Sequence, residues 1–247
     1  MTSNVPTIFV GIDDTDMPDA PGTNKLALHL AHLLHDDYET RWIVRHQLLE
    51  DPRVPCTNRN GCVSLELAPR TPAHTVAALI PRLRDEILRW IPVGSDPGLC
   101  VVEQDLIERA PQRFIAWGRL AQTELVGQQT ALRIAADMGV YLEPLAGSGD
   151  GVIGAFAAIG LLVTWNSGRV IHSHRVRPGA LDLRGTFAAE EILEFGVDEI
   201  LSLDDNSKVQ TGAIDLGKRL RPNMRDHHMV LYVAPQENGW LAQRIVS

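Results

Sequence analysis

The chain has 247 residues, of which 45% are hydrophobic and 22% charged, a composition typical of a globular protein with room for a large core. Its formal net charge of −8 argues against a nucleic-acid backbone as the main partner, because non-specific binding to phosphates depends on many Lys and Arg side chains. The longest apolar run, 151–165, is shorter than the roughly 20 residues of a membrane span. We therefore expect no membrane anchor, and the three cysteines predict free thiols in a reducing cytoplasm.

Apolar periodicity in the first hundred or so residues alternates between strand and helix patterns. The expected elements are a strand at 7–12, a helix at 24–34, strands at 41–49 and 62–67, a helix at 72–90 and a strand at 99–102. This β-α-β-β-α-β order is typical of a ferredoxin-like, split βαβ lobe.

The second half carries a helical pattern, a glycine-rich turn and several short strands. The expected elements are a helix at 113–138, a turn at 147–154 leading into a short apolar helix, strands at 161–165 and 169–176 joined by a hairpin turn at 166–168, a helix at 188–195, and strands at 199–203, 229–234 and 240–246. We therefore predict an α+β protein with a ferredoxin-like βαββαβ lobe at 1–105 and a second, mixed α/β lobe at 106–247.

Three carboxylates follow the first predicted strand within four residues, Asp13, Asp14 and Asp16. Such a cluster repels itself unless it is well solvated or neutralised by a cation, and Mg²⁺ prefers carboxylate, water and phosphate oxygens. The alternative is that the acids only cap the next helix at its positive end, but capping needs one acid and three are present. The cluster favours a magnesium site.

Three other segments are candidates for phosphate or base contacts. Thr23 is either the amino-terminal cap of the first helix or a reactive hydroxyl near the acids. The loop at 57–61, with Arg59, Asn60 and Gly61, offers amide and guanidinium donors, although an ordinary polar hairpin would look similar. The glycines at 149, 151 and 154 form a GxGxxG pattern that suits either phosphate binding or close helix packing.

Basic residues and histidines gather in two further places each. The basic groups are Arg169, Arg175, Arg177 and Arg184, and Lys218, Arg219, Arg221 and Arg225. Each is either scattered, solvated surface charge or a local basic patch. The histidine pairs at 172 and 174 and at 227 and 228 suggest metal ligands, but no third ligand is identifiable by spacing, which favours hydrogen-bonded histidines.

The string Gly11-Ile12-Asp13-Asp14-Thr15-Asp16 resembles the opening signature of the archaeal agmatidine synthetase family, whose members modify an isoleucine tRNA. Thr23 falls on the catalytic threonine of that family, and the acids correspond to its magnesium-binding residues. Three further segments agree in the same order: 51–55 resembles Asn-Pro-x-Ile-Pro, 59–61 resembles the Thr-Arg-Gly-Asn-Gly loop with a residue missing, and 151–160 is similar to the family's glycine-rich helix.

The resemblance implies an ATP- and Mg²⁺-dependent, kinase-like or ligase enzyme of tRNA processing, acting on a cytidine-type or other small acceptor. It assigns catalysis and metal binding to the three aspartates, a phosphate-accepting or positioning hydroxyl to Thr23, and nucleotide contacts to Thr15, Arg59, Asn60, Gly61, Gly149, Gly151 and Gly154.

Two departures leave alternatives open. Asn24 replaces a second threonine and Asp150 replaces a basic residue, while the OB-fold and zinc ribbon that hold tRNA have no counterpart in this chain. The alternatives are a non-catalytic nucleotide-binding regulatory or scaffold protein, and a metal-dependent phosphohydrolase of free nucleotides. The acceptor is a small molecule or a partner-delivered RNA.

Overall fold

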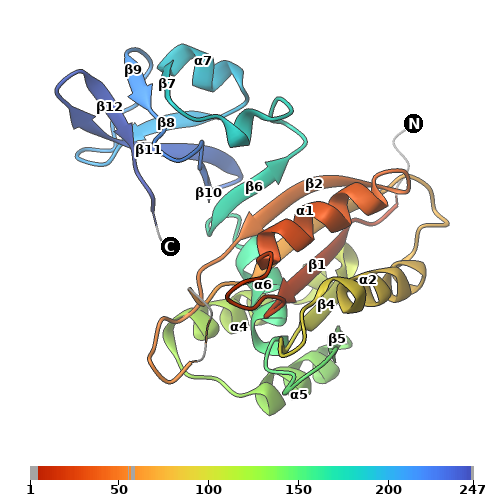
Figure 1. The fold of residues 1–247 in the computed structure, drawn as a ribbon. Helices are drawn as coiled ribbons and strands as arrows, with labels where there is room; N and C mark the ends of the chain where they lie inside the picture. Colours follow the sequence, from red (N-terminus) through yellow and green to blue (C-terminus); the bar gives the residue numbers. More distant parts are fainter. Residues whose placement is uncertain (1–4, 55, 57–58, 246–247) are drawn as a thin grey trace.

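A computed structural model describes residues 5–54, 56 and 59–245 and has mixed α/β architecture (Figure 1). The strands are β1 Ile8–Asp13, β2 Tyr38–Arg45, β3 Val63–Pro69, β4 Gly98–Glu103, β5 Tyr141–Pro144, β6 Arg169–Ser173, β7 Thr186–Ala188, β8 Glu199–Ser202, β9 Ala213–Asp215, β10 Asn223–Arg225, β11 His228–Gln236 and β12 Gly239–Ala242. The helices are α1 Thr23–Leu34, α2 Val76–Trp90, α3 Gln104–Arg109, α4 Pro111–Thr123, α5 Gln128–Met138, α6 Val152–Val163 and α7 Ala189–Glu194, with a short 3₁₀ helix at Ala180–Asp182.

The predicted β-α-β-β-α-β order is present through Glu103. These strands lie in the order β4-β1-β3-β2 with every neighbouring pair antiparallel, and β5 extends the sheet beside β4. Alternate residues of β1 enter different cores: Val10 packs with α1 and α2, whereas Phe9 packs with α4 and α6. Helices therefore cover both faces of this part of the sheet.

Helix α6 lies unusually close to β1, because small residues allow the two backbones to approach. A Cβ atom on Gly11 would lie 1.9 Å from the Ala155 carbonyl oxygen, which leaves room only for glycine. Nearly every residue of α6 is buried, so the helix is apolar on all sides. It continues the first lobe's core beyond the predicted boundary at residue 105, and that boundary stays a prediction.

Strand β6 connects the two halves of one continuous sheet. It pairs with β2 on one side and β10 on the other, and the order continues as β10-β11-β12-β9-β7, with β8 parallel to β11. A smaller core that includes Ile192 of α7 and Leu231 of β11 fills this carboxyl-terminal part. In Figure 1 these strands stand beyond the β2 edge, away from α2 and α5.

Two predicted elements are wrong. The segment 161–165 is not a strand: Leu161 and Leu162 are buried in the last turns of α6, so no hairpin forms at 166–168 and β6 pairs with β2 and β10 instead. The pattern at 113–138 is not one helix, because it is interrupted after Thr123 and α5 starts behind Gly127. A fully buried helix and a buried strand share the same continuous apolar pattern, which explains the first error.

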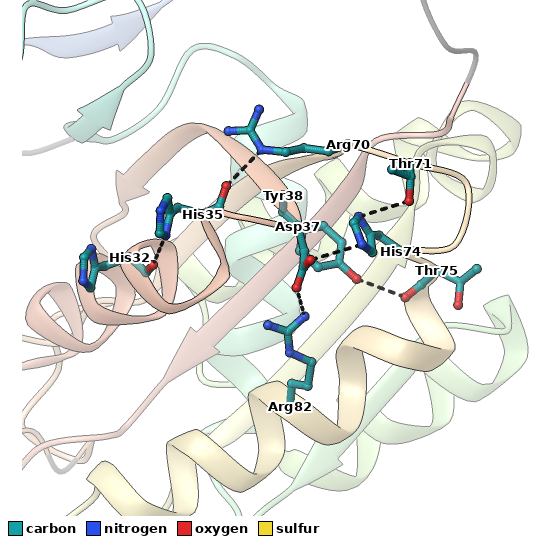
Figure 2. Close-up of polar contacts among 9 residues, drawn as sticks. All are labelled: His32, His35, Asp37, Tyr38, Arg70, Thr71, His74, Thr75 and Arg82. Atoms are coloured by element: carbon teal, nitrogen blue, oxygen red, sulfur yellow. Dashed lines mark hydrogen bonds and ion pairs between the residues drawn. The ribbon is translucent and has the colours of Figure 1, made fainter.

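Asp37 fixes the turn between α1 and β2 against the start of α2 (Figure 2). Its carboxylate accepts a hydrogen bond from Arg82 Nη1 at 2.6 Å and lies 3.2 Å from His74 Nε2. Arg70 Nε donates to the His35 carbonyl at 2.9 Å on the other side of the turn. This network links the end of α1 to the first turns of α2, on one face of the sheet and at the end opposite the acidic loop.

None of the helices in the described ranges combines the length and the apolar character that a membrane crossing requires.

Candidate functional site

The acidic loop turns back on itself where β1 ends. Asp13 is the last residue of the strand, and Asp14 adopts a left-handed backbone conformation with φ of 53°. Thr15 is fully buried, and its hydroxyl donates to the Thr23 hydroxyl at 3.0 Å. The turn therefore gathers the acids at the amino-terminal end of α1.

A cavity of about 290 Å³ brings most of the predicted site residues together. Those that line it are Asp13, Asp14, Asp16, Arg59, Asn60, Gly61, Gly151 and Gly154. Thr15, Thr23 and Gly149 are not part of its lining. Three loops that are far apart in the sequence thus meet in one place.

Three acids that sequence reasoning left without a site role, Asp96, Glu124 and Asp150, also line the cavity. Asp96 precedes β4, and the antiparallel pairing of Asp13 with Gly98 places the start of β4 beside the end of β1. Its carboxylate accepts a hydrogen bond from the Ser148 backbone and so anchors the glycine-rich loop. No local motif identifies Asp96 as a residue of the cavity. Knowing that β1 and β4 are neighbours in the sheet would have identified it.

The clustered charge raises the pKa of two carboxyls. Burial, followed by the negative charge of Asp14, raises the pKa of Asp13 from 3.8 to about 7. Burial, followed by the charge of Asp96, raises the pKa of Asp14 from 3.8 to about 6. Burial is the main cause of both shifts, and neighbouring carboxylates add to it, whereas the charge of Arg45 offsets only part of the shift at Asp13.

A divalent cation would supply the missing positive charge. Among the described residues, no group of three or more His, Cys, Asp or Glu side chains is arranged to hold a metal ion on its own. Mg²⁺, however, is commonly held by one or two carboxylates together with substrate phosphates and water. The uncompensated Asp13 and Asp14 fit that donor set when a nucleotide completes it.

The glycine-rich loop is shaped by the acids as much as by any ligand. A Cβ on Gly154 would lie 1.8 Å from Asp13 Oδ2, and one on Gly151 would lie 2.4 Å from the Asp96 carbonyl oxygen. The N–H groups of Gly151 and Ile153 already donate to the carbonyls of Asp96 and Asp150. These glycines are required for close approach, and phosphate binding by the loop stays a prediction.

Thr23 does not cap α1, contrary to the sequence-based alternative. The cap position is Gly22, which makes no side-chain capping bond, and Thr23 is the first residue of the helix. Thr23 is buried, and its hydroxyl accepts the bond from Thr15. The reactive role of Thr23 stays a prediction. That role requires the hydrogen bond from Thr15 in the acidic loop to break, so that the Thr23 hydroxyl becomes available.

The loop that follows β2 presents two cations to the cavity, Arg53 and Arg59, and Arg53 is already paired with Asp51 at 2.8 Å. Arg59 is exposed, and Asn60 is held in place because its Nδ2 donates to the Leu49 carbonyl at 2.8 Å. Arg45 Nη2 lies 3.5 Å from the Arg59 carbonyl. Positions 55, 57 and 58, part of the predicted loop and of the family-like 51–55 segment, lie outside the described residues.

The histidine pairs do not assemble with further ligands in the described part of the chain. His172 Nε2 lies 3.1 Å from the Thr40 carbonyl, His174 Nδ1 lies 3.1 Å from the Arg41 carbonyl, and His227 stacks on Trp165.

Comparisons with solved structures identify similar folds. A crystal structure of apo TiaS, the agmatidine synthetase of an isoleucine tRNA, matches with a TM-score of 0.53 at 22% identity, over 62% of this chain and 35% of that one. A complex of TiaS with that tRNA and ATP matches with a TM-score of 0.55 at 19% identity, over 76% and 44% of the two chains. A complex of TiaS with the tRNA, AMPCPP and agmatine matches with a TM-score of 0.52 at 16% identity, over 89% and 52%.

No protein-family model and no curated protein matches the chain. The chain spans between about a third and a half of the length of the three TiaS structures. The resemblance predicted from the motifs at 11–16 and 151–160 is therefore confirmed as a similarity of fold between this chain and part of TiaS.

Proposed function

We propose that the chain is an ATP- and Mg²⁺-dependent phosphotransferase or ligase-like enzyme. The observation that carries the proposal is the cavity that unites six carboxylates with Arg53 and Arg59. Solved structures of similar fold include TiaS complexes with ATP and with AMPCPP, which favours a nucleotide as the ligand of this cavity. We also interpret the β4-β1-β3-β2 arrangement as a ferredoxin-like lobe.

The acidic and the basic residues of the cavity would bind different parts of the ligand. Asp13, Asp14 and Asp16 would hold Mg²⁺, which offsets the charge of the triphosphate during phosphoryl transfer. Arg59, with its exposed guanidinium, would contact phosphate oxygens. The tight packing of Gly154 against Asp13 would keep one carboxylate directed into the cavity.

Thr23 would accept or position the transferred phosphate, and the neighbouring Thr15 hydroxyl would hold its oxygen in place. Asn60, Gly61, Gly149 and Gly151 would shape the nucleotide pocket. The acceptor would be a cytidine-type base or another small molecule: ATP would phosphorylate its carbonyl oxygen, and an amine would then displace the phosphate.

A second candidate is a nucleotide-binding regulatory or scaffold protein that does not catalyse the reaction. Two observations favour it: Thr23 does not line the cavity, and Asp150 presents a negative charge where phosphate would lie. This candidate predicts binding of Mg-ATP without turnover.

Labelled ATP incubated with the purified chain and Mg²⁺, with and without bulk tRNA or small amines, tests the proposal. We expect Mg-ATP to raise the melting temperature and excess chelator to abolish the increase. Conversion to ADP or AMP that depends on an added acceptor supports the enzyme, and release of phosphate without any acceptor supports a phosphohydrolase. Binding without turnover supports the regulatory protein, and the absence of any thermal shift contradicts all three.

A further inference from the structure

A second large cleft lies between α1 and the carboxyl-terminal strands and has a volume of about 680 Å³. Its cationic lining residues are Lys25, Arg169, Arg177, Arg219 and Arg221. Asp182 is the acid that lines it, and this carboxylate is already paired with Arg219 at 3.2 Å. In a chain whose net charge is −8, this cleft concentrates positive charge.

The sheet itself brings the arginines together. Arg169 at the start of β6 is the direct cross-strand partner of Arg45 in β2. On its other side, the Val170 N–H donates to the Pro222 carbonyl at 2.9 Å, which places Arg221 beside the same strand end. Like charges directly opposite each other destabilise a sheet, so the fold maintains an unfavourable contact here.

The partners of these guanidinium groups are missing within the described residues. Arg169 and Arg221 form no ion pair there, and Arg221 Nε is buried without a hydrogen-bond partner. By contrast, Arg175, which follows the end of β6, pairs with Asp198. A buried guanidinium nitrogen without a partner is unfavourable unless a ligand supplies the acceptor.

The charges that act on the pKa of Arg169 are all positive. Burial, followed by the charge of Arg221, lowers the pKa of Arg169 to about 10, and Arg45, Arg244 and Arg219 act in the same direction. Its guanidinium remains charged at neutral pH. An anion bound beside this guanidinium would relieve the repulsion.

We propose that this cleft is a binding site for a phosphate-bearing ligand, with Arg169 and Arg221 contacting the phosphate oxygens. Guanidinium groups present paired donors that match phosphate geometry. The volume exceeds that of one phosphate, so the ligand carries either several phosphates or an organic part. The inference concerns a site separate from the acidic cavity and does not depend on ATP turnover.

Titration calorimetry on the full chain in a chelating buffer tests this site, because the chelator suppresses magnesium-dependent binding at the acidic cavity. The separate probes are pyrophosphate and a short single-stranded RNA. We expect at least one probe to bind, and Arg169→Gln and Arg221→Gln each to weaken it by roughly tenfold, the loss expected for one charged hydrogen-bond donor. Arg133→Gln, at an exposed position of α5, is the matched control and should bind as wild type.

The two probes also distinguish between two kinds of phosphate-bearing ligand. Binding of pyrophosphate alone indicates a small phosphorylated compound, and tighter binding of RNA indicates backbone phosphates. If Arg169→Gln does not fold, Arg169→Lys keeps the charge but not the paired donors, and an intermediate loss is expected. The site is rejected if neither probe binds, if the cleft variants bind as wild type, or if Arg133→Gln weakens binding equally.

Discussion

Like charges are held close together in two places, the acidic cavity and the cleft lined by Arg169 and Arg221, but the repulsion is relieved differently in each. The carboxyls of Asp13 and Asp14 have pKa values raised to about 7 and 6, so they relieve repulsion by taking up protons near neutral pH. Arg169, with a pKa of about 10, does not lose its proton there. We therefore expect the cavity to respond to pH and to cations, and Arg169 in the cleft to respond to anions. Arg45 is coupled to both, because its charge lowers the pKa of Asp13 and also that of Arg169.

The largest expected effect is on turnover at the acidic cavity. Asp14→Asn removes a charged oxygen from the proposed magnesium site and should lower ATP turnover by roughly 100-fold, as the loss of one transition-state contact does. Product formation from labelled ATP measures it. Asp19→Asn, at an exposed position of the same loop, is the control and should keep wild-type turnover. Equal turnover in Asp14→Asn and wild type would remove Asp14 from the site.

A substitution that changes the shape of the cavity but not its charge should show how far ligand binding depends on shape. In Gly154→Ala the new Cβ would meet Asp13 Oδ2 at 1.8 Å and push the carboxylate aside. We expect the stabilisation by Mg-ATP to be lost, together with roughly 1–3 kcal/mol of folding free energy from overpacking. Gly127→Ala is the matched control: Gly127 lines the same cavity, but its Cβ would meet nothing within 4 Å. Urea unfolding with and without Mg-ATP distinguishes them.

A third prediction concerns pH. The folded pKa of Asp13, about 7, lies above the ordinary value of 3.8, so the stabilisation from its protonation is complete below 3.8 and is lost as the pH rises through 7. Asp13→Asn removes this dependence. Its melting temperature should exceed that of wild type by several degrees at pH 8, and the difference should shrink as the pH falls toward 5. A difference that is constant from pH 5 to pH 8 would contradict the raised pKa.

Buried His46 also makes stability depend on pH in the lower part of this range, because its ring takes up a proton near pH 6.5 in the unfolded chain but not in the folded protein. Burial, followed by the charge of Arg45, lowers its pKa from 6.5 to about 3, so its contribution to stability is present above 6.5 and declines as the pH falls below that value. This trend opposes that of Asp13. Comparing Asp13→Asn with wild type at each pH cancels the histidine contribution, because both proteins carry it.

Sequence patterns were sufficient where a local signal determines the structure. The short run of β-branched residues at 7–12 predicts β1, and the acidic string identifies its loop. The cluster at Arg169 was not predictable in the same way. It draws Arg169 from one basic segment and Arg221 from another, while Arg175 pairs with Asp198. Only the pairing of β6 with β2 and β10 reveals which arginines meet.

The smallest expected effect belongs to a region where opposite charges already compensate each other. The hydrogen bond from Arg82 is the main cause that lowers the pKa of Asp37 below 3.8, so the stabilisation is present above 3.8 and is lost as the pH falls through the lowered value. Because the pair is exposed, water and salt screen it. Asp37→Asn should therefore lower the melting temperature only slightly at pH 7, and added salt should reduce the difference further. A larger loss in Asp37→Asn than in Gly154→Ala would mean that compensated surface charge matters more to this fold than the packing around Asp13.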